Sequence, residues 1–248
     1  MIDLHCHFLP EIDDGPQSMA EAVVLANMAV NNGISKAIVT PHIHPGRYEN
    51  NKTSISSVFL DFKQTLKNLG VNLSLGMAAE VRLCPEIIPM IKQDQIPFLG
   101  KLDGFEIMLL EFPHSHIPFG SDNLVKFLIK QGIKPMIAHP ERNKEIMADS
   151  NKISPFVNMG CLLQLTAGSL AGKFGVSCKD VAETLLMNNT VSIIATDAHN
   201  EDHRPPDLRQ GYDCVSKLMG TNIADNLIKH TPEMISACHF ESEELQVS

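Results

Sequence analysis

The sequence begins with "MIDLHCH", residues 1–7, in which two histidines stand one residue apart. Apolar and polar residues alternate along this stretch, which indicates a strand whose side chains point to opposite faces in turn. We therefore expect His5 and His7 on one face and Cys6 on the other. Two neighbouring imidazoles at a strand end could bind one metal ion, or they could be ordinary polar residues. The residues at the other strand ends distinguish these two interpretations.

Strand and helix patterns alternate along the whole chain. After the first strand, short apolar strands are predicted at 36–41, 71–81, 104–112, 134–140, 161–166 and 191–196. Helices are predicted at 19–31, 53–69, 84–93, 119–131, 143–159, 178–189 and from 208 to about 238. This alternation predicts a parallel sheet covered on both faces. Seven such units favour a TIM-type barrel; a doubly wound sheet is the alternative, but neither glycine-rich nucleotide motif is present.

Two local features refine this prediction. Ser18 and Glu21 have the spacing of a capping box, and Asn32-Gly33 would end the helix that it opens. Between the second strand and the second helix, residues 44–57 form a polar loop that we expect to be mobile.

Length, charge and cysteine content limit the class of protein. A chain of 248 residues fits one large α/β barrel, so a single domain over 1–248 is expected. The net charge of −9 argues against a general nucleic-acid binder. Six scattered cysteines without a C-x-x-C pair predict reduced thiols. With no leader-like start and no uncharged apolar span, we expect a cytoplasmic protein without membrane insertion.

Six of the seven predicted strands end in histidine or carboxylate residues. The C-terminal ends of parallel barrel strands meet on one face, where active sites are built. One such residue is usually structural, but so many are difficult to attribute to chance. Imidazole and carboxylate without thiolate suit Mn, Fe or Zn, and this set would serve two or three ions. The candidate ligands are His5, His7, Asp14, His42, Glu80, Glu111, His139, Asp197 and His199.

Such a cluster would attract an anion although the protein is acidic. The four carboxylates carry less charge than three divalent ions would bring, and the ions dominate the local field. Metal clusters of this kind activate water and hold phosphate oxygens during displacement. Arg142 follows the His139 ligand closely, and its planar guanidinium suits phosphate. Arg47 and Arg204 lie in loops on the same face and could do likewise, or be plain surface arginines.

Eight motifs in order resemble the polymerase-and-histidinol-phosphatase (PHP) superfamily of metallophosphoesterases. They are "MIDLHCH", "DDGP", "TPH", "AAEVRL", "LLEFP", "IAHPERN", "LTAGSLAG" and "TDAHN", and they run from Met1 to about Pro232 with the sequence around them. Within the superfamily the chain is most similar to manganese-dependent protein-tyrosine phosphatases of bacterial capsule and exopolysaccharide loci. The resemblance implies a distorted (β/α)7 barrel with a trinuclear Mn²⁺ centre.

The resemblance also implies roles for particular residues. It implies arginines around the substrate phosphate at positions 47, 142 and 204. Glu106 lies in the middle of the strand that ends in Glu111, and Asp13 stands beside Asp14. Both are acidic residues close to a candidate ligand but are not assigned as ligands. The three implied ligand groups are His5, His7, Glu111 and Asp197; Glu80, Glu111 and His139; and Asp14, His42 and His199.

The implied substrate is the phosphorylated tyrosine-rich tail of a membrane-associated bacterial kinase. The alternatives are a phosphatase for a small molecule such as histidinol phosphate, and an inactive, metal-bearing regulatory module, which would not need a complete ligand set. A cysteine-based phosphatase is disfavoured because no cysteine begins a C-x5-R motif. Ser169 is a weak alternative nucleophile, and the oligomeric state is not indicated.

Overall fold

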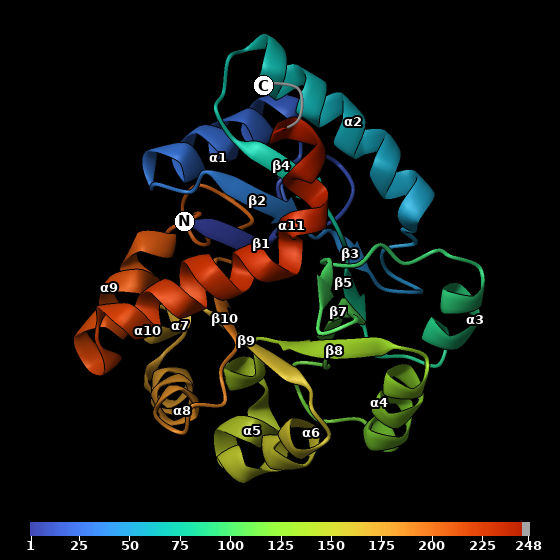
Figure 1. Ribbon diagram of the computed structural model, residues 1–248, viewed down its shortest axis with the longest axis vertical. Coiled ribbons are helices and arrows are strands. Elements are labelled where there is room, and N and C mark those ends of the chain that lie inside the picture. Colours follow the sequence, from blue (N-terminus) through green and yellow to red (C-terminus); the bar gives the residue numbers. More distant parts are fainter. Residues whose placement is uncertain (245–248) are drawn as a thin grey trace.

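The computed structural model describes residues 1–244, and strands and helices alternate along it (Figure 1). Residues 245–248, the end of the expected single domain, lie outside the described residues. The strands are β1 (Ile2–Cys6), β2 (Lys36–Val39), β3 (His42–Ile43), β4 (Ser74–Met77), β5 (Glu80–Arg82), β6 (Lys101–Leu102), β7 (Phe105–Glu111), β8 (Ile133–Ala138), β9 (Leu162–Thr166) and β10 (Ile193–Ala195).

Helices follow most of these strands. They are α1 (Met19–Asn31), α2 (Lys52–Asn68), α3 (Ile87–Lys92), α4 (Ser121–Lys130), η1 (Pro140–Arg142), α5 (Lys144–Ala148), η2 (Ser150–Ile153), α6 (Ser154–Asn158), α7 (Ala167–Leu170), α8 (Val176–Met187), α9 (Leu208–Met219), α10 (Thr221–Asp225), η3 (Asn226–His230) and α11 (Thr231–Glu244). Among the described residues, no helix combines the length and apolar character needed to span a bilayer.

The strands form two sheets that are parallel except for one short strand. One sheet has the order β1-β2-β4, and the other has the order β10-β9-β8-β7-β5-β3, with β6 antiparallel to β7. Backbone hydrogen bonds from Asp197 N to His5 O (2.7 Å) and from His7 N to Ala198 O (2.8 Å) join β1 to the segment that follows β10. The predicted α/β class with parallel strands is confirmed.

The second predicted strand is followed by a short strand that was not predicted, and the third predicted strand is divided in two. Within 36–41 the strand β2 ends at Val39, and β3 begins at His42, just after Pro41; the stretch 71–81 is broken at Ala78-Ala79 into β4 and β5. Pro41 has no N–H group to donate, so the ladder of β2 cannot continue through it. After both breaks the chain enters the other sheet, where His42 pairs with Glu80. The breaks therefore place these two candidate ligands side by side.

Other predicted boundaries also change. The stretch 143–159 is divided into α5, η2 and α6, because Asp149 takes an extended conformation and accepts a hydrogen bond from Asn151 N at 3.0 Å. The polar loop 44–57 ends before Lys52, where α2 begins, since Asn51 caps that helix. Only half of the capping box forms at Ser18. Its side chain accepts from Glu21 N, whereas the Glu21 carboxylate accepts from Gln17 N.

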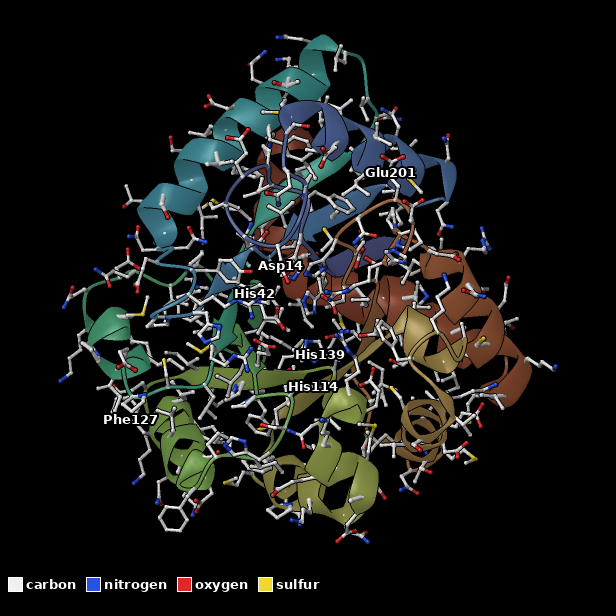
Figure 2. All side chains as sticks on the ribbon, turned by 180° about the vertical axis from the view of Figure 1, so that it is seen from behind. Asp14, His42, His114, Phe127, His139 and Glu201 are labelled. Carbon is white, nitrogen blue, oxygen red and sulfur yellow. The ribbon has the colours of Figure 1, made fainter. Side chains whose placement is uncertain are left out.

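The last helix closes one opening of the strands. Ile235 and Phe240 of α11 join a buried apolar cluster that includes Leu4 of β1 and Leu109 of β7. Figure 1 shows α11 crossing in front of the strands, and Figure 2, from behind, shows Asp14, His42 and His139 in the middle of the opposite side. The apolar cluster around α11 and the candidate ligands thus lie at opposite ends of the strands.

Candidate metal centre

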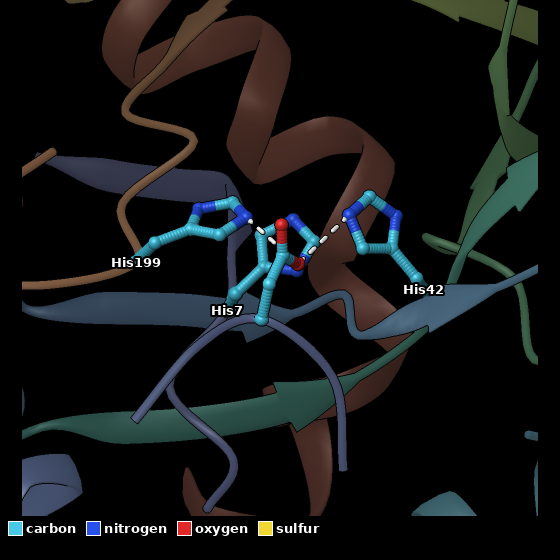
Figure 3. Close-up of side chains that lie close together, drawn as sticks. His7, His42 and His199 are labelled. Carbon is cyan, nitrogen blue, oxygen red and sulfur yellow. Dashed lines mark ion pairs between the residues drawn. The ribbon is translucent and has the colours of Figure 1, made fainter. Parts of the chain in front are cut away.

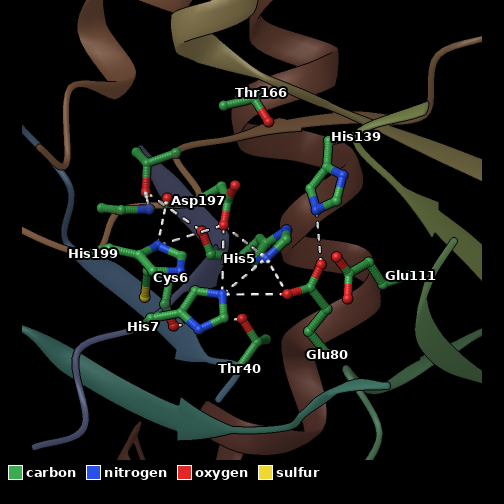
Figure 4. A network of polar contacts seen from close by, with 12 residues as sticks. His5, Cys6, His7, Thr40, Glu80, Glu111, His139, Thr166, Asp197 and His199 are labelled. Atoms are coloured by element: carbon green, nitrogen blue, oxygen red, sulfur yellow. Dashed lines mark hydrogen bonds and ion pairs between the residues drawn. The ribbon is translucent and has the colours of Figure 1, made fainter. Parts of the chain in front are cut away.

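Four side chains from three segments, namely β1 with the residue after it, β5 and the segment after β10, meet at the most buried point of the candidate site. The Nε2 atom of His5 lies 3.2 Å from Nε2 of His7, 3.2 Å from Oδ1 of Asp197 and 3.4 Å from Oε2 of Glu80 (Figure 4). All four side chains are at most 1% exposed. Each offers one atom to a group whose members lie within 4.8 Å of one another.

The hydrogen bonds made by the Nδ1 atoms of His5 and His7 determine whether their Nε2 atoms carry a proton or a lone pair. Nδ1 of His5 contacts Gln164 Oε1 at 2.9 Å, and Nδ1 of His7 contacts Asp13 Oδ2 at 2.7 Å. Because both acceptors can only accept, each Nδ1 carries the proton and each Nε2 presents a lone pair when the ring is neutral. Two lone pairs facing each other at 3.2 Å repel unless a cation lies between them. This arrangement fits a metal ion.

Two further groups of candidate ligands overlap with the first. His7, Asp14, His42 and His199 form one (Figure 3), and His42, Glu80 and Glu111 form the other. Nε2 of His42 lies 3.2 Å from Asp14 Oδ1, and its Nδ1 lies 2.9 Å from Glu80 Oε2. Nδ1 of His199 donates to the Asp197 carbonyl at 2.9 Å, so this ring also directs Nε2 toward Asp14.

The groups differ from the implied partition: His42 takes the place of His139 beside Glu80 and Glu111, and His7 is added to Asp14, His42 and His199. Glu80, rather than Glu111, accompanies His5, His7 and Asp197. His139 belongs to none of the three groups found among the described residues, but its Nε2 contacts Glu80 Oε1 at 2.8 Å. All nine candidate ligands are therefore connected, with Glu80 at the centre of the network.

Several buried ligand atoms make ion-pair contacts with one another or with Arg82 but form no hydrogen bond. A buried polar atom left unsatisfied costs free energy, so such atoms usually indicate a missing ligand, ion or water. Mixed imidazole and carboxylate donors suit Mn, Fe or Zn. The residues present therefore fit divalent ions. The buried atoms without a hydrogen bond in this cluster are His42 Nδ1, Glu80 Oε2, Glu111 Oε2, Asp197 Oδ1 and His199 Nε2.

Burial and neighbouring charges shift the pKa values of several candidate ligands. Burial lowers the pKa of His5, but the Glu80 and Asp197 carboxylates outweigh it and raise that pKa to about 10. Burial and the Glu80 carboxylate raise the pKa of Glu111. Burial also lowers the pKa of His139, to about 4, with a contribution from Arg142. At His5, a proton and a metal ion would therefore compete for the same nitrogen atom.

Two of the three predicted arginines reach the cluster. Arg142 and Arg204 both form ion pairs with Oδ2 of Asp197, the oxygen opposite the one that faces His5. The guanidinium of Arg142 also lies 4.6 Å from the ring centroid of Phe174.

Arg47, the third predicted arginine, is placed differently. It is exposed, and its guanidinium lies 4.9 Å from the ring centroid of Tyr48. That ring stacks on His42 at 5.4 Å with 8° between the planes. Arg47 is thus linked to the centre through one aromatic side chain.

Three contacts of the ligands were not predicted. Asp13, which was not assigned as a ligand, contacts Nδ1 of His7 and orients that ring. Arg82 forms an ion pair with Glu111 at 3.0 Å; its position two residues after Glu80 on the same strand was a usable signal. Gln164 contacts His5 from the one predicted strand that offered neither histidine nor carboxylate, and nothing in the sequence indicates its role.

The other candidates have structural surroundings. Ser169 is fully buried and donates to Glu141 Oε1 at 2.7 Å. Glu106 pairs with Lys101 at 3.1 Å rather than with the cluster. The Cys6 thiol is directed toward the Ile38 carbonyl oxygen at 3.6 Å, and burial raises its pKa well above the usual value.

Comparison with known proteins identifies the family. The model of the family described as "Capsular polysaccharide synthesis, CpsB/CapC" matches residues 1–236. The chain belongs to the CpsB/CapC family. Its relatives include CapC of Staphylococcus aureus, 36% identical over 85% of this chain and 81% of that protein. Tyrosine-protein phosphatase YwqE of Bacillus subtilis is 33% identical over 90% of this chain and 87% of that protein.

A solved structure agrees with this membership in the CpsB/CapC family. The crystal structures of YwqE from Bacillus subtilis and CpsB from Streptococcus pneumoniae are described as unique metal-dependent tyrosine phosphatases. The matched chain has a TM-score of 0.89 at 31% identity and covers 96% of this chain and 94% of its own length. The predicted resemblance is thus confirmed over nearly the whole chain.

Proposed function

We propose that this protein is a metal-dependent protein-tyrosine phosphatase that acts in bacterial capsule or exopolysaccharide synthesis. The observation that carries the proposal is the convergence of three overlapping imidazole and carboxylate groups with two arginines on Asp197. The named activities of the relatives support the same reaction. We further propose that the two sheets constitute a distorted (β/α)7 barrel and that residues 1–248 form one domain.

In this proposal the nine candidate ligands hold two or three divalent ions, with Mn²⁺ as the native metal. When bound, the ions supply Lewis acidity for attack of water on a phosphate monoester. Asp13 and Gln164 keep the Nε2 atoms of His5 and His7 directed at the centre. Arg142 and Arg204 would turn from Asp197 toward the phosphoryl oxygens, where a guanidinium can make two parallel hydrogen bonds. Arg47 would contact the substrate at the rim.

The depth of the candidate ligands below the surface is the physical reason to expect phosphotyrosine as the substrate. His5, His7, Glu80 and Asp197 are nearly inaccessible, while Asp14 at the rim is 39% exposed. A phosphate carried on an aromatic ring would reach the arginines and the ions, whereas phosphoserine is shorter by that ring. A cavity of about 260 Å³ beside His139 and Arg142, with Phe112 and Pro140 in its wall, offers apolar surface for the ring.

A tyrosine-phosphorylated kinase with a disordered tail is the proposed partner. Such a tail could thread a protruding side chain into this site. We propose a cytoplasmic location, where six free cysteines would remain reduced.

The test compares kcat/KM for a phosphotyrosine peptide, the matching phosphoserine peptide and histidinol phosphate at one Mn²⁺ concentration. We expect the phosphotyrosine peptide to exceed phosphoserine by at least about tenfold, which is about 1.4 kcal/mol of transition-state binding. A tenfold advantage for histidinol phosphate would instead establish the small-molecule alternative.

Two variants test the mechanism separately from the substrate. His42→Ala should lose most of kcat, because His42 belongs to two ligand groups. Cys6→Ser should retain it, because the thiol contacts a β2 carbonyl outside the cluster. An inactive Cys6→Ser that folds and binds metal would favour a thiol nucleophile. Absence of phosphatase activity in metal-loaded protein would favour the regulatory module.

A further inference from the structure

Gln164 is a fully buried polar residue on β9, the predicted strand without a candidate ligand. Its Oε1 atom lies 2.9 Å from Nδ1 of His5 and 3.2 Å from the backbone nitrogen of His139. One oxygen of β9 thus accepts hydrogen bonds from a ligand ring on β1 and from the backbone of a ligand that follows β8.

The backbone hydrogen bond supports an unusual conformation. His139 has φ 33° and ψ 53°, in the left-handed region that residues other than glycine seldom adopt. Such a residue costs about 1–3 kcal/mol and persists only where its surroundings hold it. The His139 amide donates to Gln164, and the His139 ring contacts Glu80. Gln164 is therefore one of the contacts that hold this turn.

Asp13 repeats the same pattern at the other histidine. Its Oδ2 atom accepts from Nδ1 of His7 at 2.7 Å and from the backbone nitrogen of His42 at 3.0 Å. Each imidazole of the His5–His7 pair is therefore held by a single oxygen that also holds the amide of another candidate ligand. Asp13 and Gln164 differ in charge but share this hydrogen-bond geometry.

We propose that Gln164 is a positioning residue of the metal centre, which fixes His5 as the Nδ1–H tautomer and holds His139 in its turn. It does not touch the ions or the substrate and acts only through these two ligands. The proposal rests on the metal centre of the proposed function. Without the acceptor, a neutral His5 could take the other tautomer, whose protonated Nε2 cannot bind metal.

The side-chain nitrogen of Gln164 shows how the role of the oxygen acceptor can be tested apart from the polarity of the side chain. The Nε2 atom of Gln164 has no hydrogen-bond partner. Replacement by glutamate would remove a donor that is not used and keep the oxygen acceptor. Replacement by methionine, of similar length, would remove the acceptor and keep the bulk.

The experiment measures Mn²⁺ affinity by competition with a fluorescent chelator in wild type, Gln164→Met, Gln164→Glu and Leu163→Val. Loss of a residue that supports a metal ligand typically lowers metal affinity about 10- to 100-fold, and we expect this for Gln164→Met. Gln164→Glu should recover the affinity to within about threefold of wild type, since it restores the acceptor. Leu163→Val, on the same strand, controls for lost packing; it should lower the Tm without lowering affinity.

The outcomes separate this inference from the proposed function. A wild type that binds no Mn²⁺ would overturn both. A wild type that binds Mn²⁺ while folded Gln164→Met binds it equally would overturn the inference alone, as would equal losses in the methionine and glutamate variants. If Gln164→Met does not fold, Gln164→Asn, whose shorter side chain withdraws the oxygen from His5, should show the same loss.

Discussion

Asp197 connects the two halves of the candidate site. Its Oδ1 faces the Nε2 atoms of His5 and His7, and its Oδ2 pairs with Arg142 and Arg204. Burial alone would raise the pKa of this carboxyl, but Arg204, His5 and Arg142 hold it well below its usual range. The carboxylate is therefore ionised at neutral pH and can act as a ligand, and it also holds the two arginines that we propose bind the substrate phosphate.

Arg142→Lys tests the arginine role at the scale of one residue. Lysine keeps the charge but loses the planar fork and the contact of the guanidinium with Phe174. We expect kcat/KM to fall about 10- to 1000-fold, as for loss of one preorganised donor to the transition state, with unchanged metal content. Arg209→Lys, whose guanidinium faces Tyr212, is the matched control and should keep wild-type kinetics. Wild-type kinetics in Arg142→Lys would place this residue outside the site.

At the scale of elements, α11 fixes the end of the molecule opposite the ligands. Gly100, with φ +134°, lies so close to this helix that an added Cβ would stand 1.9 Å from the Ile235 carbonyl oxygen. Gly76 of β4 makes a second close approach, with an added Cβ 2.8 Å from His239. Gly100 thus faces the backbone of α11, whereas Gly76 faces the side chains of His239 and Ile38.

Gly100→Ala should therefore be strongly destabilising. Gly104 also has positive φ (+82°), but an added Cβ there would meet nothing within 4 Å. Gly104→Ala should cost about 1 kcal/mol of unfolding free energy through backbone strain alone, and Gly100→Ala several times more because of the clash. Urea unfolding of both variants measures the difference. Equal losses would mean that α11 is not packed as described.

The same helix predicts a pH dependence. Burial lowers the pKa of His239, while Glu106 and Lys63 contribute with opposite signs. The unfolded chain takes up a proton near pH 6.5, and the folded chain does so only at lower pH. The stability contribution of neutral His239 is thus present above about pH 6.5 and is lost as pH falls. His239→Gln should lessen the decline in unfolding free energy between pH 7 and 5, measured without added metal; identical slopes would contradict this.

At the scale of the whole molecule, the candidate metal centre brings together residues from distant parts of the chain. Its candidate ligands run from His5 to His199, and they lie on or after strands of both sheets. Ions bound there would join segments that are far apart in the sequence. Because only the folded chain assembles the site, metal binding should add to the free energy of unfolding.

Mn²⁺ at one hundred times its Kd should stabilise the protein by about 2.7 kcal/mol, which corresponds to a rise of about 5–10 °C in Tm for a chain of this size. Prolonged chelation should reverse the rise and abolish phosphatase activity, and Mn²⁺ should restore both. Asp197→Ala, which removes a central ligand, should show a much smaller rise. Full activity in demetallated protein would exclude the proposed mechanism.

The sequence by itself determined the class of fold and the set of candidate ligands. Strand periodicity and helix capping are local, so the alternation of elements could be predicted to within a few residues. Because parallel strands align their C-terminal ends, residues such as His5, Glu80 and Asp197 could be assigned to one site before their contacts were known.

Only the tertiary structure decided how the candidate ligands are divided among the three groups and which residues hold them in place. The start of β3 after Pro41 and the division of the third predicted strand after Ala78 depend on which sheet pairs with the chain there, a long-range competition for backbone partners. The role of Gln164 depends on packing β9 beside β8 and directing one amide oxygen at a histidine 159 positions away. Distances across strands are fixed by packing, and no spacing in the sequence encodes them.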